Sequence, residues 1–139
     1  MSTTQPAANA EQDPRVRAVF DDIRATRGSD FINAFWRHLA LDAALLESTW
    51  AEVKRTMVAP SALDALTKEL IYIAVSTANG CSYCVHSHTA AARAKGMTGA
   101  QYADLLAVIG LAGKTNHLAT ALQIPVDPVF DAGQAVKQP

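Results

Sequence analysis

The segment 67–95, TKELIYIAVSTANGCSYCVHSHTAAARAK, constrains the fold of this chain more than any other stretch. The apolar residues of its first half recur with the 3.6-residue period of a helix. Asn79-Gly80 then breaks the pattern, as this dipeptide favours a turn. A second helix is predicted to begin at about Cys81 and to end at Gly96, since glycine is a favoured C-cap. We therefore expect two packed helices, with the motif CSYC at the start of the second.

One part of this segment also fits a different structure. Residues 70–77, LIYIAVST, are rich in β-branched side chains and resemble a buried strand. A strand, a Cys-x-x-Cys motif and a helix in succession are typical of a thioredoxin-like unit. Three features favour a helix: residues 61–64 form a helix-start box, the apolar positions fit the helical period, and no other strand is available for pairing.

The rest of the chain indicates an all-α fold of about six helices. Hydrophobic residues make up 50% of the 139 residues, aromatic residues only 6%, and alanine is abundant, which favours closely packed helices. We expect a flexible arm over 1–12, one helical domain over 13–124 and an irregular tail over 125–139. Trp36 and Trp50, which occupy helically spaced apolar positions, are expected in the core or at a subunit interface.

Charge and hydropathy exclude several classes of partner. A net charge of −1 gives no electrostatic reason to expect nucleic acid or an anionic membrane surface. No apolar run reaches the roughly 18 residues that span a bilayer. The first twelve residues lack the basic and apolar regions of a secretory signal. We expect a cytoplasmic protein with no nucleic-acid or membrane partner, in which a Cys-x-x-Cys motif is redox-active or metal-binding.

The two cysteines share one helix face with a histidine. Cys81, Cys84 and His88 are spaced by three, four and seven residues, so their side chains point the same way on a helix. Cysteines three apart in a helical turn have Cα atoms about 5–6 Å apart, within disulfide range. The helix start also stabilises a thiolate. If the two helices pack antiparallel, Glu69 of the first reaches His88 and orients its ring, which gives a proton relay.

Zinc binding is the main competing interpretation of the same residues. Cys81, Cys84, His86 and His88 are all possible ligands. However, His86 faces away from the others on a helix. Structural zinc sites usually take ligands from two separated elements, and the sequence has no second Cys/His pair. We therefore expect no zinc site.

At these positions the sequence resembles the AhpD-like alkylhydroperoxidase branch of the carboxymuconolactone decarboxylase family. The match consists of Glu69, the motif Cys81-Ser82-Tyr83-Cys84 and the following His88, and it extends to KGMT at 95–98. The resemblance covers about 60–122.

The resemblance implies an all-helical, AhpD-like fold with the Cys-x-x-Cys motif at the start of a central helix, assembled into trimers or hexamers. It also implies thiol peroxidase chemistry without haem, flavin or metal. Cys84 matches the peroxidatic cysteine, Cys81 the resolving cysteine, and His88 and Glu69 the proton relay, while Tyr83 has a supporting role. The partners implied are a hydroperoxide and an external dithiol or disulfide reductase system that restores the thiols.

Some alternatives remain open. Helix-dipole reasoning favours Cys81 as the more acidic thiol, whereas the resemblance assigns the attack to Cys84. A disulfide reductase or redox sensor would use the same cysteine pair. The decarboxylase branch of the family lacks that pair, so decarboxylation is ranked low. A non-catalytic helical assembly protein would use its alanine-rich faces only for oligomerisation.

Overall fold

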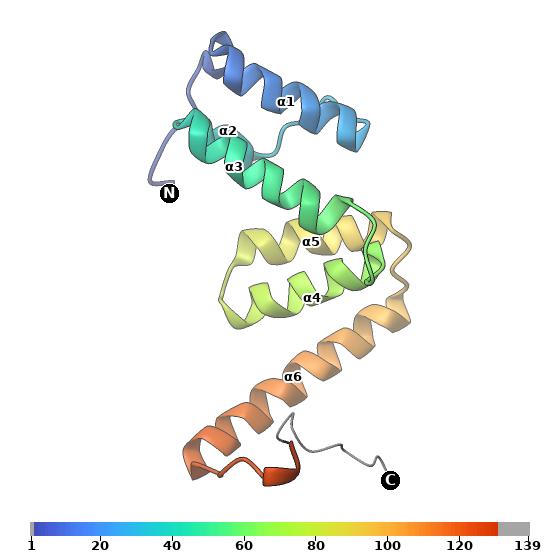
Figure 1. Ribbon diagram of the computed structural model, residues 1–139. Helices are drawn as coiled ribbons and strands as arrows, with labels where there is room; N and C mark the ends of the chain where they lie inside the picture. Colours follow the sequence, from blue (N-terminus) through green and yellow to red (C-terminus); the bar gives the residue numbers. More distant parts are fainter. Residues whose placement is uncertain (1, 131–139) are drawn as a thin grey trace. The chain divides into compact units, whose positions relative to one another are not determined.

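The computed structural model describes residues 2–130, and all of its regular secondary structure in that range is helical (Figure 1). The predicted all-α fold of about six helices is therefore confirmed. The α-helices are α1 (Pro14–Arg27), α2 (Ala34–Leu39), α3 (Ala43–Val53), α4 (Ala65–Ala78), α5 (Ser82–Ala94) and α6 (Gly99–Leu122). Short 3-10 helices occupy Ala10–Gln12 and Pro128–Phe130, and a π-helical turn, Lys54–Val58, follows α3.

The chain divides into two compact units, the first ending at Leu63 and the second beginning at Asp64. The prediction of a single domain over 13–124 stays a prediction. Of the predicted tail, residues 131–139 lie outside the described residues, and the described part includes the 3-10 helix Pro128–Phe130.

The first unit is built around the apolar faces of α1 and α3. Helix α1 begins where the Asp13 side chain accepts a hydrogen bond from the Arg15 amide, and it ends at Gly28, whose φ of 62° is left-handed. Trp36 and Trp50 meet edge to face in the core, as predicted for core residues. The buried apolar residues of this unit are Val16, Val19, Phe20, Ile23, Ile32, Trp36, Leu46 and Trp50.

The N-terminal segment, predicted to be a flexible arm, makes specific contacts with this unit. Glu11, in the 3-10 helix, forms a salt bridge with Arg24 of α1 at 2.8 Å. The hydroxyl of Thr4 lies 2.8 Å from Nδ1 of His38. Both contacts involve partners far along the chain, which a local sequence pattern does not reveal.

The second unit begins with the helix pair α4 and α5. The Asp64 side chain caps α4 by accepting the amide hydrogen of Thr67 at 2.9 Å. Gly80, with a φ of 69°, turns the chain between the two helices. Residues 70–77 lie inside α4, so the strand interpretation is wrong: the capped helix start and the helical apolar period outweigh the β-branched composition.

Helix α6 is apolar and nevertheless has no buried residue. It starts at a capping box formed by Thr98 and Gln101, and Tyr102, Leu105 and Ile109 pack against the small core of Ile73, Ala92 and Met97.

By length and composition alone, α6 is also long and apolar enough to cross a membrane, which corrects the expectation that no segment meets that test. The expectation considered apolar runs, whereas α6 includes polar residues and Lys114 and still contains a stretch with a mean hydropathy of 1.2. A single such helix is only a weak indication, since helices that pack against other protein share this composition.

Candidate functional site

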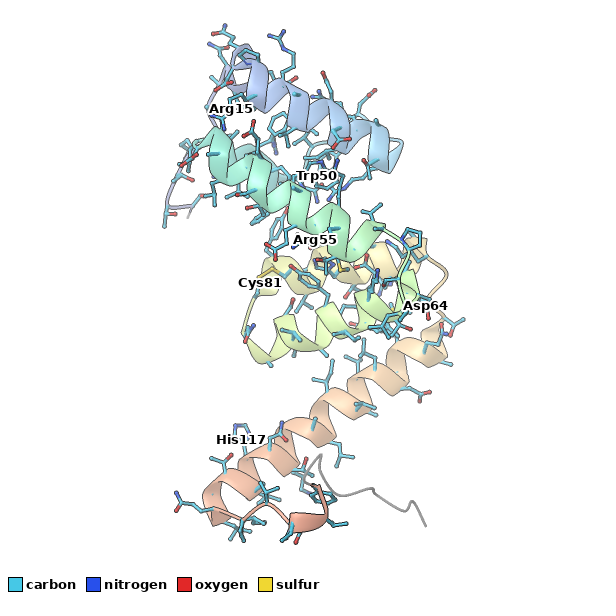
Figure 2. The ribbon with its side chains drawn as sticks, viewed as in Figure 1. Arg15, Trp50, Arg55, Asp64, Cys81 and His117 are labelled. Carbon is cyan, nitrogen blue, oxygen red and sulfur yellow. A yellow bond between two sulfur atoms is a disulfide. The ribbon has the colours of Figure 1, made fainter. Side chains whose placement is uncertain are left out.

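The cysteine pair lies at the N-terminus of α5. Cys81 is the N-cap residue and Cys84 lies in the first turn, and the two form a disulfide with Cα atoms 5.4 Å apart. Figure 2 shows this disulfide as a yellow bond beside the labelled Cys81. The Cys84 amide also donates a hydrogen bond to Sγ of Cys81 at 3.3 Å. The predicted position of the motif at a helix start and the predicted Cα spacing are both confirmed.

The acid and the imidazole meet across the helix pair. Oε2 of Glu69, on α4, lies 2.7 Å from Nδ1 of His88, on α5. The Glu69 side chain is only 6% exposed and that of His88 is 23% exposed. The contact expected from antiparallel packing is therefore present. With Nδ1 engaged by the carboxylate, Nε2 is the ring nitrogen left to exchange a proton with another group.

Lys95, which sequence reasoning missed, is a second partner of Glu69. Its Nζ lies 2.9 Å from Oε1 of the same carboxylate. Burial raises the pKa of the Glu69 carboxyl, whereas the hydrogen bonds from His88 and Lys95 lower it. The lowering is the larger effect, so the pKa lies below its ordinary value. The carboxylate is thus ionised at neutral pH. Lys95 follows His88 by seven residues, two helical turns on the same face, and that spacing was the available signal.

Tyr72 is the other neighbour that the sequence did not reveal. Its ring stacks on the imidazole of His88, with centroids 3.6 Å apart and planes 20° from parallel. Tyr72 follows Glu69 by three residues on α4, so both side chains lie on the same side of that helix. Only the packing of α4 on α5 places this side of α4 against His88.

Other candidate residues lie differently. Tyr83, between the two cysteines, is 45% exposed. His86 is exposed, on a different side of α5 from His88. Within residues 2–130, no group of three or more His, Cys, Asp or Glu side chains is arranged to hold a metal ion.

A cavity of about 300 Å³ opens beside Cys81 rather than Cys84. It lies at the turn between α4 and α5, and is lined by Ser76, Thr77, Gly80, Cys81, Ser82 and Val85. A larger cavity, of about 550 Å³, lies in the first unit against residues 6–12 and contains none of the candidate catalytic residues. The smaller cavity is therefore the one that adjoins the cysteine pair.

Comparison with known proteins links these residues to one family. Residues 44–127 match the carboxymuconolactone decarboxylase family. The alkyl hydroperoxide reductase AhpD of Solibacter usitatus is 34% identical over 79 residues, which are 57% of this chain and 43% of that protein. The chain thus spans under half the length of that reductase.

A solved structure matches nearly the whole chain. The crystal structure of the alkylhydroperoxidase AhpD core from Rhodospirillum rubrum superposes with a TM-score of 0.90 at 65% sequence identity. The match covers 94% of this chain and 97% of that one. The AhpD-like fold predicted from the motif is therefore confirmed.

Proposed function

Because this chain belongs to the carboxymuconolactone decarboxylase family, we propose that it is a thiol peroxidase that reduces hydroperoxides through the pair Cys81 and Cys84. The observation that carries the proposal is the arrangement on α4 and α5: a disulfide at a helix start, followed one turn later by a histidine that is bonded to a buried carboxylate. The names of the two relatives, an alkyl hydroperoxide reductase and an alkylhydroperoxidase, support the same reaction.

The proposed cycle begins with both cysteines reduced. The Cys84 thiolate attacks the distal oxygen of the hydroperoxide, the O–O bond breaks, and the remaining oxygen leaves as an alcohol, or as water, after taking up a proton. Cys84 is now a sulfenic acid. The thiolate of Cys81 attacks the Cys84 sulfur, water leaves after protonation, and the disulfide forms. An external dithiol or disulfide reductase system then reduces the disulfide and is itself oxidised.

In this cycle the proton relay consists of His88 and Glu69. His88 lies one helical turn beyond Cys84, so its free Nε2 faces the same side as that sulfur. The Glu69 carboxylate holds Nδ1 and stabilises the imidazolium that forms when the ring accepts the thiol proton. Although burial raises the pKa of Glu69, the hydrogen bonds from His88 and then Lys95 outweigh burial and hold that pKa below its ordinary value. The arrangement supports Cys84 as the attacking thiol, with Tyr83 in a supporting role.

A disulfide reductase or redox sensor is the second candidate function, and the position of the cavity favours it. In this candidate function an external thiol would approach the disulfide through the cavity that Cys81 lines, and no peroxide would be involved. Slow peroxide turnover together with fast exchange with a dithiol would favour this function.

The test of the peroxidase proposal uses the dithiothreitol-reduced chain, freed of excess reductant and mixed with an alkyl hydroperoxide. We expect the wild type to consume peroxide and to lose both thiols of the pair. Cys84→Ser is expected not to react. Cys81→Ser is expected to react once and to stop as a sulfenic acid, which dimedone traps.

The variants separate the candidate functions. Peroxide that leaves both wild-type thiols intact contradicts the peroxidase proposal. Unchanged peroxide consumption by Cys84→Ser contradicts the assignment of the attacking cysteine, and would favour a helical assembly protein in which the pair is not catalytic.

The proposal includes a cytoplasmic homo-oligomer, a trimer or hexamer. The exposed leucines of α6, namely Leu106, Leu111, Leu118 and Leu122, support self-association, since a monomer rarely leaves so many large apolar side chains of one helix in solvent. Sedimentation velocity is expected to show an oligomer for the wild type and a smaller species for Leu118→Lys. A monomeric wild type contradicts this part of the proposal.

A further inference from the structure

We propose that Tyr72 is a positioning residue for His88, and that its ring, rather than its hydroxyl group, does the positioning. This inference rests on the proposed function, because it assigns Tyr72 a role in the proton relay. The observation is the stack of the two rings, with centroids 3.6 Å apart and an interplanar angle of 20°.

Two contacts from α4 restrict the imidazole in different ways. The Glu69 carboxylate accepts the hydrogen bond of Nδ1, because an ionised carboxylate has no proton to donate. This bond fixes one edge of the ring but leaves the plane free to tilt about it. The Tyr72 ring covers one face and limits that tilt. Together the two contacts define where Nε2 points.

The direction of Nε2 matters for proton transfer. A proton moves efficiently to or from a sulfur or an oxygen only when the imidazole nitrogen is within hydrogen-bond reach and aligned. The Tyr72 ring also keeps water from one face of the imidazole, which protects the Nδ1 hydrogen bond from competition. Among residues 2–130, the charged and titratable side chains bonded to or stacked on this ring or its acid are Glu69 and Tyr72 on α4 and Lys95 at the end of α5.

The contacts of Tyr72 in the described part of the chain involve its ring and not its hydroxyl group. The hydroxyl makes no hydrogen bond to another residue in the described range 2–130, so it has no anchoring function there. The side chain is 39% exposed and lies outside the buried core of Ile73, Ala92 and Met97. Replacing it therefore leaves the core of the helix pair intact, and the effect on His88 can be measured in a folded protein.

The test compares Tyr72→Leu, which removes the aromatic ring, with Tyr72→Phe, which keeps it. We expect Tyr72→Leu to lower the second-order rate constant for the reaction with peroxide by about tenfold. This is less than the roughly 100-fold or more that general acid–base catalysis contributes, because His88 itself is still present. Tyr72→Phe is expected to stay within about twofold of the wild type, since the stack is retained. Thermal melts establish that both variants are folded.

A second readout follows the imidazole without any peroxide. In NMR spectra the ring current of Tyr72 shifts the carbon-bound protons of His88, and the Nδ1 proton bonded to Glu69 gives a downfield signal. Tyr72→Leu is expected to remove the ring-current shift and to speed exchange of the Nδ1 proton with water, and Tyr72→Phe to preserve both.

The two readouts separate the inference from the function on which it rests. If the wild type does not consume peroxide but the NMR results are as expected, the peroxidase proposal fails and the positioning of His88 stands. If Tyr72→Leu leaves the Nδ1 proton and the peroxide rate unchanged, the inference is overturned. It is also overturned if Tyr72→Phe is impaired as strongly as Tyr72→Leu, because the hydroxyl group would then be required.

Discussion

The two units of this protein bury different kinds of side chain. In the first, α1, α2 and α3 enclose apolar residues, with two tryptophans edge to face among them. In the second, α4 and α5 bury few large apolar side chains. Among residues 2–130, the buried polar residues all belong to this second unit: Lys68, Glu69, Ser76 and Thr89. Apolar burial is the main source of stability, so it contributes more to the first unit than to the second.

The second unit buries polar groups at a cost in free energy. Burying the Glu69 carboxylate carries a desolvation penalty, which its partners His88 and Lys95 offset. Thr89 even leaves a buried hydroxyl without a hydrogen-bond partner in the described part of the chain. The same unit exposes the apolar residues of α6. A helix pair that keeps an acid, an imidazole and two sulfurs together has less space for a conventional core.

The largest expected effect on stability is in the first unit. Leu46 is 0% exposed, and Leu46→Ala should lower the free energy of unfolding by about 2–5 kcal/mol, because it leaves a cavity among packed side chains. Amide hydrogen exchange should show the loss of protection concentrated in α1 and α3 rather than in α4 and α5.

The neighbouring Leu45 provides the matched control, since it is 47% exposed on the same helix. Leu45→Ala is expected to change the protection of α1 and α3 far less. Equal losses for the two substitutions would mean that the first unit does not depend on its buried core, and the comparison between the units would fail.

A smaller effect, dependent on pH, is expected in the second unit. The pKa of Glu69 lies below the ordinary value of 4.5, because the lowering by His88 and Lys95 exceeds the raising by burial. A carboxyl with a lower pKa in the folded state stabilises the fold above its unfolded-state pKa, and the contribution is lost as the pH falls through the folded-state pKa. The stability advantage of the wild type over Glu69→Gln should therefore shrink below about pH 4.5.

Denaturant titrations of the wild type and Glu69→Gln, at neutral pH and in steps down through this range, measure that advantage. Glu47→Gln is the control for an exposed carboxylate on α3. An advantage for the Glu69 carboxylate that stays constant from neutral to acid pH would show that its ionisation does not stabilise the second unit.

The smallest effect is expected at the surface of the first unit. Arg15 and Glu47 form a salt bridge between α1 and α3, but both side chains are well exposed. Solvent and salt screen such pairs, so Arg15→Ala should leave the denaturation midpoint unchanged within error. A salt-dependent loss approaching that of Leu46→Ala would show that charge, rather than apolar burial, holds the first unit together.

The sequence by itself determined the helices and the cysteine pair, because these depend on neighbours along the chain. The helical period and Gly80 indicated α4 and α5, although Asp64 caps α4 and the predicted box that begins at Ser61 does not form. A spacing of three placed Cys81 and Cys84 within disulfide range. The contact of Glu69 with His88 also followed, from the antiparallel packing that a short turn enforces.

Only the tertiary structure decided the other contacts of the site and the division into units. Tyr72 meets His88 because α4 and α5 pack at one particular rotation, which no spacing within a single helix specifies. The spacing of Lys95 from His88 places both on one face of α5, but only the packing brings Lys95 to Glu69. The sequence also did not indicate that α6 is exposed, since an apolar helix has the same sequence pattern whether or not it packs inside its own chain. Local periodicity thus defines the elements, whereas the contacts between them depend on which faces meet.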